Sequence, residues 1–137
     1  MKSKLSSPLG QIYRNPTMTP NNLETPSKLN KTQLDNLSRV YKAVELLDAL
    51  DPHITVIQMH ILLIVGKSPD ITITEVADIL GRTLGAVSRN IGILTTRGDR
   101  DRVGLGLIER REDYHDRRVR LVRLSPKGNR LMARIVN

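Results

Sequence analysis

Arginine is the residue type in this chain whose placement most clearly suggests a chemistry. A guanidinium group forms paired hydrogen bonds with phosphate oxygens or with the edge of guanine. Like charges crowded on a two-stranded ribbon destabilise it unless counter-charges are supplied, and Glu112, Asp113 and Asp116 supply some of them. We therefore expect a ribbon that binds a polyanion, with a salt-bridged, solvent-exposed hairpin as the alternative. The arginines are Arg110, Arg111, Arg117, Arg118, Arg120 and Arg123.

A second group of candidate contact residues lies about 25 residues earlier, at the start of a predicted helix. Small and polar side chains there allow the helix to approach the major groove of DNA, and an arginine one turn further on can reach guanine or phosphate. The alternative is an ordinary amphipathic helix with one solvated face. The candidate residues of this group are Arg82, Thr83, Ala86, Ser88 and Arg89.

The distribution of charge along the chain supports a polyanion as the partner. The formal net charge of the 137 residues is +8. Residues 1–80 carry equal numbers of basic and acidic side chains, so the whole excess lies in residues 81–137, where every basic residue except Lys127 is arginine. A positive charge that served only solubility would have no reason to be confined to one half of the chain.

Apolar periodicity predicts the elements that must position these residues. Residues 1–30 contain four of the seven prolines and no apolar periodicity, so we expect a flexible arm there and a domain over residues 31–137. Apolar residues at three- and four-residue spacing predict a long helix over 31–51 that stops at Asp51 and Pro52. The apolar residues are Leu34, Leu37, Val40, Tyr41, Val44, Leu47 and Leu50.

Capping signals predict a helix-turn-helix within residues 55–128. Thr55 with Gln58, and Thr72 with Glu75, have the spacing of capping boxes. The second of these helices ends at Gly81, and Thr83 caps the next helix after a very short turn.

The segment after the helix-turn-helix predicts a β-hairpin and a last helix. The β-prone stretches 107–111 and 119–124 bracket a polar turn, and Ser125 with Pro126 starts a short helix over 126–137. The expected fold class is α+β, mainly α. It is a winged helix-turn-helix with a two-stranded wing and a long N-terminal helix.

The sequence from Thr55 to Gly128 resembles the multiple-antibiotic-resistance regulator (MarR) family of winged-helix transcription regulators. The resemblance lies in "ITITEVADILGRTLGAVSRNIGILT" and in "GLIERREDYHDRRVRLVRLSPKG". It implies that Ser88 and Arg89 face the major groove, that Asp116 orients the wing and that Arg118 enters the minor groove. The function expected from it is a sequence-specific regulator that binds duplex DNA.

The chain departs from the family pattern in three places. Family members usually end in long helices that form the dimer, whereas only residues 129–137 follow Gly128 here. We therefore expect a homodimer that uses the apolar stripe of the first helix, formed by Leu34, Leu37, Val40, Val44 and Leu47. The connection "TRGDRDRVGLG" is longer than usual and is expected to extend the base of the wing. The chain has no Phe or Trp to line an effector pocket, so we expect no small-molecule effector.

Several classes of function are not expected from this sequence. It has no cysteine, no long apolar segment and no leader-like N-terminus, so we expect a cytoplasmic, nucleoid-associated protein with no membrane partner. No nucleophile beside a base and no glycine-rich phosphate loop is present, so no enzyme activity, catalytic residue or cofactor is expected. No metal site is expected either, since "DYHD" at residues 113–116 is a weak candidate. Two alternatives to a regulator remain: a replication, partition or recombination factor that marks a DNA site, and a winged-helix module that binds an acidic protein.

Overall fold

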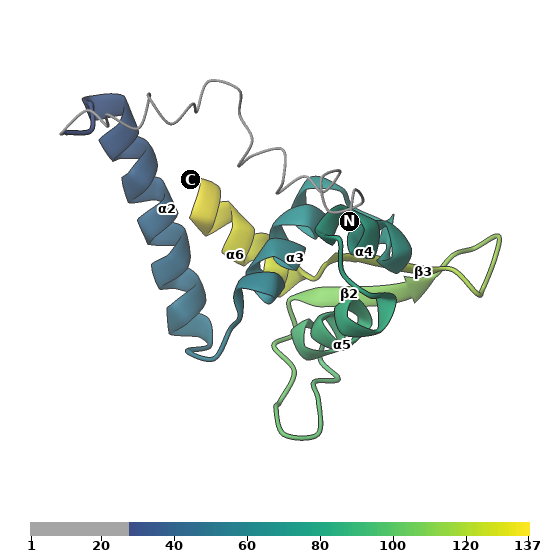
Figure 1. Ribbon diagram of the computed structural model, residues 1–137. Coiled ribbons are helices and arrows are strands. Elements are labelled where there is room, and N and C mark those ends of the chain that lie inside the picture. Colours follow the sequence, from purple (N-terminus) through teal and green to yellow (C-terminus); the bar gives the residue numbers. More distant parts are fainter. Residues whose placement is uncertain (1–27) are drawn as a thin grey trace.

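The computed structural model describes residues 28–137, which form five helices and one small antiparallel sheet (Figure 1). This confirms the predicted mainly helical winged-helix fold class. All but the last three residues of the predicted arm lie outside the described residues. The elements are α2 (Lys31–Leu50), α3 (Val56–Lys67), β1 (Ile71–Thr72), α4 (Ile73–Leu80), α5 (Leu84–Leu94), β2 (Ile108–Glu112), β3 (Arg120–Leu124) and α6 (Pro126–Val136).

Helix α2 has one end in the domain core and the other end projecting from it (Figure 1). Asn30 and Gln33 form a capping box at its N-terminus, and Asp51 ends it as predicted. Leu47 is 4% exposed and belongs to the core, so its assignment to the dimer stripe was wrong. The earlier apolar residues of the stripe are about half exposed or more. These are Leu34, Leu37, Val40 and Val44.

A buried glutamine connects α3 to α5 and fixes their relative position. Gln58 is 1% exposed. It completes the predicted capping box with Thr55, accepting the Thr55 backbone N–H at 3.0 Å. Its amide nitrogen donates to Asn90 Oδ1 at 3.1 Å, and Asn90 in turn donates to the carbonyl oxygen of Ala86 at 2.9 Å. Since a buried amide left without partners is costly, this network favours one orientation of α5 on α3.

The sheet contains one strand more than the predicted hairpin. Its strand order is β1-β3-β2, and the two residues of β1 pair with Val122 and Leu121 of β3. The predicted hairpin forms between β2 and β3, with Ile108 opposite Leu124 and Glu112 opposite Arg120. The wing is therefore attached to the segment just before α4 as well as to the core, because Ile71 and Val122 are both buried.

The connection from α5 to β2 does not extend the base of the wing as we expected. It folds back on the C-terminal end of α5, where the backbone N–H of Leu105 donates to the Ile93 carbonyl at 3.0 Å. Within this connection Asp99 and Arg102 form an isolated β-bridge, and the side chain of Arg102 pairs with Asp51 at the end of α2. We call residues 95–107 the α5–β2 loop.

Two glycines near helix N-termini should respond in opposite ways to alanine. A Cβ on Gly128 would lie 2.1 Å from the backbone oxygen of Leu107, whereas nothing lies within 4 Å of a Cβ on Gly85. Gly128→Ala should destabilise the fold by about 1–3 kcal/mol through overpacking. The control Gly85→Ala should stabilise it by about 0.5–1 kcal/mol, since alanine restricts the unfolded chain more. Urea unfolding followed by circular dichroism measures both changes, and equal stability of the two variants would contradict the packing described.

Candidate nucleic-acid interface

The N-terminal end of α5 presents small and polar groups to solvent. Gly81 ends α4 with a left-handed backbone (φ 62°). After Arg82, the hydroxyl of Thr83 accepts the backbone N–H of Ala86 at 3.2 Å, as its predicted role as N-cap requires. Arg82, Thr83 and Ala86 are all exposed. The N-terminus of α5 is thus exposed to solvent and carries the positive end of the helix dipole. Both features favour its approach to an anionic groove.

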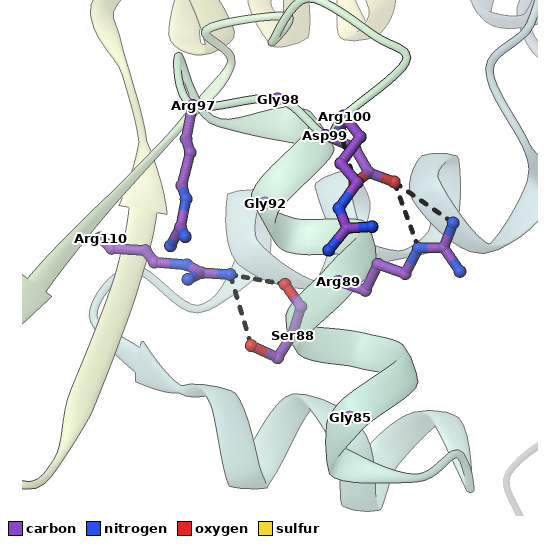
Figure 2. A pocket seen from close by; sticks show the side chains of 9 residues that line it. All are labelled: Gly85, Ser88, Arg89, Gly92, Arg97, Gly98, Asp99, Arg100 and Arg110. Carbon is purple, nitrogen blue, oxygen red and sulfur yellow. Dashed lines mark hydrogen bonds and ion pairs between the residues drawn. The ribbon is translucent and has the colours of Figure 1, made fainter.

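Arg110 of β2 is directed at α5 and not at solvent (Figure 2). Its Nη2 donates to the backbone oxygen of Ser88 at 2.5 Å and lies 3.5 Å from the Ser88 hydroxyl. Burial, together with the positive charges of Arg97 and Arg120, lowers the pKa of the Arg110 guanidinium. Both Arg110 and Ser88 were predicted as DNA contacts, and the structure brings them together as the contact that holds the wing strand against α5.

The wing turn presents an arginine that is held in place by a nearby carboxylate. Asp116 accepts the backbone N–H of Arg118 at 3.0 Å and its Nε at 3.2 Å, while the Arg118 side chain stays 90% exposed. The hydrogen bonds from the Arg118 side chain and backbone lower the pKa of the Asp116 carboxyl. Neighbouring Arg117 is exposed. Asp116 therefore holds the Arg118 side chain in place within the wing turn.

Acidic residues neutralise three other arginines of the sheet. Arg120 pairs with Glu112 at 2.8 Å on the cross-strand register that the hairpin gives them. Successive residues of a strand point to opposite faces, so Arg111 lies on the other face of the sheet from Arg110, where it pairs with Asp70 at 2.9 Å. Arg111 is therefore separated from the other predicted site residues. The third pair joins Arg123 to Glu109 at 3.2 Å.

A hollow between α5 and the wing brings the two predicted groups together. Ser88 of α5 lines it together with Arg118 and Arg120 from the wing. Thr72, Ile73, Thr74, Leu84 and Val119 complete its lining. Helix α5 and the wing thus form one continuous surface.

Sequence reasoning missed a residue that orients Arg89. Asp99 in the α5–β2 loop accepts Arg89 Nε and Nη2, with the closer contact at 3.2 Å, and the Arg89 side chain remains 75% exposed. The backbone N–H of Arg100 and the Arg89 side chain lower the pKa of Asp99. No sequence signal pointed to this pair, because its ten-residue separation spans a helix end and an irregular loop.

The described residues offer no assembled metal site. Within residues 28–137 no group of three or more His, Cys, Asp and Glu side chains comes together. The "DYHD" segment forms the wing turn, in which Asp113 accepts the backbone N–H of His115 at 2.7 Å. None of the described helices is both long and apolar enough to cross a membrane.

A short-turned helix pair whose second helix is fixed to a charged β-ribbon defines a winged-helix DNA-binding protein. No family model and no curated protein matches the chain. Among solved structures, FabT from Streptococcus pneumoniae in complex with DNA is 31% identical, with 77% of this chain and 70% of that chain covered and a TM-score of 0.55. A mutant of E. coli MarR complexed with operator DNA is 26% identical, with 76% and 69% covered and a TM-score of 0.52. The S. aureus MepR–DNA complex, at 24% identity, 77% and 78% coverage and a TM-score of 0.58, shares the fold.

The chain belongs to the MarR family of winged-helix transcription regulators. It is accordingly a DNA-binding regulator and not an enzyme. Family membership also favours this function over the site-marking factor and the protein-interaction module considered from the sequence.

The Asp116 carboxyl should titrate below the usual range of an aspartate, and the pair should dissociate as the pH falls through that lowered pKa. Arg118→Ala should move the Asp116 pKa back towards its ordinary value, since it removes the side-chain hydrogen bond. The pKa of Asp99 is lowered chiefly by the hydrogen bond from the backbone N–H of Arg100, so it should not change in this variant. Asp99 therefore serves as the internal control. Carboxyl carbon chemical shifts followed by NMR against pH measure both groups. An Asp116 pKa that is the same with and without Arg118 would contradict the contact.

Proposed function

We propose that this regulator binds a specific duplex sequence with α5 in the major groove and the wing turn in the flanking minor groove. The observation that carries the proposal is the contact from Arg110 to Ser88, which holds helix and wing as one unit. On this unit Arg89 and Arg118 remain exposed, each positioned by a carboxylate. The FabT and mutant MarR structures named above were solved with DNA, which supports the same partner here.

Each exposed site residue has a proposed role in this docking. Arg89 reads a base edge, since a guanidinium matches the two acceptors of guanine. Thr83 and Ala86 allow close approach, and Arg82 contacts phosphate near the N-terminus of α5. On the wing, Arg118 enters the minor groove, where a narrow A·T-rich groove attracts a positive charge. Arg117 and Arg120 contact the backbone beside it, and Arg111 is not included because Asp70 engages it on the other face of the sheet.

We also propose that the protein acts as a homodimer through the projecting part of α2. The half-exposed side chains of Leu34, Leu37, Val40 and Val44 follow helical spacing, and Tyr41 beside them is 64% exposed. A contiguous apolar stripe of this kind typically covers a partner helix. Two such protomers would bind inverted half-sites separated by about one helical turn or more.

No small-molecule effector forms part of the proposal, since the chain lacks Phe and Trp. A protein of this kind would reside on the nucleoid in the cytoplasm.

Binding to duplex DNA should weaken steeply with salt. The basic excess of residues 81–137 predicts a slope equivalent to about five to ten neutralised phosphates. Titration of a fluorescent duplex at several salt concentrations measures the slope. An absence of binding, or binding that does not respond to salt, would refute the proposed function.

Removal of Arg89 and removal of Arg118 should weaken DNA binding in different ways. Arg89→Ala should cost about 1–3 kcal/mol on the preferred duplex and relax its preference at one or two positions. Arg118→Ala should weaken binding most where the flanks are A·T-rich. Asp116→Ala should give a milder form of the Arg118 effect. Binding is measured on a panel of duplexes after circular dichroism has established that each variant folds. Equal losses on every duplex would mean that both arginines contact only phosphates.

The α2 stripe should control the oligomeric state. Leu37→Glu combined with Val40→Glu should convert a dimer into a monomer, because two carboxylates would then be buried in the interface. Val56→Glu is the matched control, since Val56 is 76% exposed and lies on α3, away from the stripe. Sedimentation velocity at micromolar concentration distinguishes the two states. A wild-type monomer, with or without DNA, would exclude the proposed dimer.

A further inference from the structure

A second hollow lies beside α5 and shares Ser88 and the α5 face with the first (Figure 2). Its floor is the face of α5 formed by Gly85, Ser88 and Gly92, three small residues at helical spacing. The α5–β2 loop and Arg110 form its walls. We call it the arginine hollow after the four arginines that line it: Arg89, Arg97, Arg100 and Arg110.

The arginine hollow carries far more positive than negative charge. Asp99 is the only acidic residue in its lining, and that carboxylate is already engaged by Arg89 and by the backbone N–H of Arg100. Within residues 28–137, the Arg97 and Arg100 side chains are in none of the ion pairs. Their guanidinium groups are therefore available to an anion.

Arg110 gives a second, independent sign that an anion belongs here. Its Nε is buried without a hydrogen-bond partner in the described chain. The same guanidinium is close enough to Arg97 and Arg120 for their charges, after burial, to disfavour its protonated form. A buried N–H without a partner and repulsion between like charges both cost folding free energy. An anion in the hollow would reduce the repulsion between these guanidinium groups.

We propose that the arginine hollow binds a phosphate group, supplied by the DNA strand next to the groove that α5 occupies. Guanidinium groups match phosphate oxygens in pairs. The hollow opens on the face of α5 that carries Ser88 and Arg89, so a strand lying along this helix would pass over it. The α5–β2 loop would then act as an additional backbone clamp. This inference rests on the proposed function, because it requires α5 to dock on DNA.

Variants that remove charge from the loop test the proposal on the full chain. Arg97→Ala and Arg100→Ala, alone and combined, leave the backbone hydrogen bonds of both residues intact. Arg130→Ala is the matched control, since it removes one exposed arginine from α6, outside the hollow. Should the alanine double variant fail to fold by circular dichroism, Arg97→Gln combined with Arg100→Gln repeats the test. Arg110 is left unchanged because it holds the wing to α5.

The experiment has two arms that separate the possible sources of phosphate. In the first arm, the salt slope of duplex binding should fall by about 0.9 for each phosphate that the loop variants no longer neutralise, with the preferred sequence unchanged. Arg130→Ala should keep the wild-type slope. In the second arm, calorimetry of the protein without DNA measures the binding of inorganic phosphate against chloride at equal ionic strength.

Each outcome decides one question. A reduced slope for the loop variants supports a phosphate of the DNA strand. The salt slope could instead stay unchanged while the loop variants, but not Arg130→Ala, lose the binding of inorganic phosphate. That result supports the phosphate site and assigns it to a free phosphate compound. An unchanged slope without phosphate binding overturns the inference while leaving the proposed function intact. A wild-type protein that binds no duplex at all refutes the proposed function instead.

Discussion

The hydrogen bond from Arg110 to the backbone of Ser88 is the interaction on which the DNA-facing surface depends. To bind two grooves at once, α5 and the wing hairpin must keep a fixed relative orientation. A hairpin that was not attached to α5 would lose conformational entropy on docking. The Arg110 guanidinium helps to fix this orientation because it connects the middle of α5 to the middle of β2. Gln58 supports α5 from the opposite side through Asn90, so the helix is held between the core and the wing.

The arrangement of charge follows from this constraint. An arginine that must remain partly buried at the junction of helix and wing repels its neighbours, and most arginines nearby are matched by a carboxylate. Arg89 and Arg118 keep their side chains exposed although each is paired, so pairing at these two positions orients a contact residue more than it stabilises the fold. Exposed ion pairs contribute at most about 1 kcal/mol each. Near α5 and the wing, no carboxylate pairs with Arg97 and Arg100 of the α5–β2 loop or with Arg117 of the wing turn, and a phosphate would substitute for the missing partner there.

Local signals were sufficient to predict most of the helices. The caps at Thr55, Thr72 and Thr83 and the left-handed glycine at residue 81 each act within a few residues, so the helix starts and the short turn could be read directly. The hairpin was likewise predictable from two β-prone runs. Strand β1 was not, because two residues carry no periodicity and pair only once β3 is in place.

Site residues were less predictable where long-range contacts decide their roles. Arg110 and Arg111 are adjacent and chemically identical, and only the strand register places one against α5 and the other beside Asp70. Leu47 has the spacing of the α2 stripe but lies where the helix enters the core. The α5–β2 loop is positioned by Asp51, about fifty residues earlier in the chain. None of these partners can be identified from spacing alone.

Methylation interference on a selected duplex tests most directly whether helix and wing read the two grooves as a unit. Dimethyl sulfate modifies guanine N7 in the major groove and adenine N3 in the minor groove, so one experiment reports on both. Interference is expected at major-groove guanines in the centre of each half-site and at minor-groove adenines on its flank. Binding that methylation of neither guanine N7 nor adenine N3 reduces would show that the protein reads neither groove and would contradict the docking proposed.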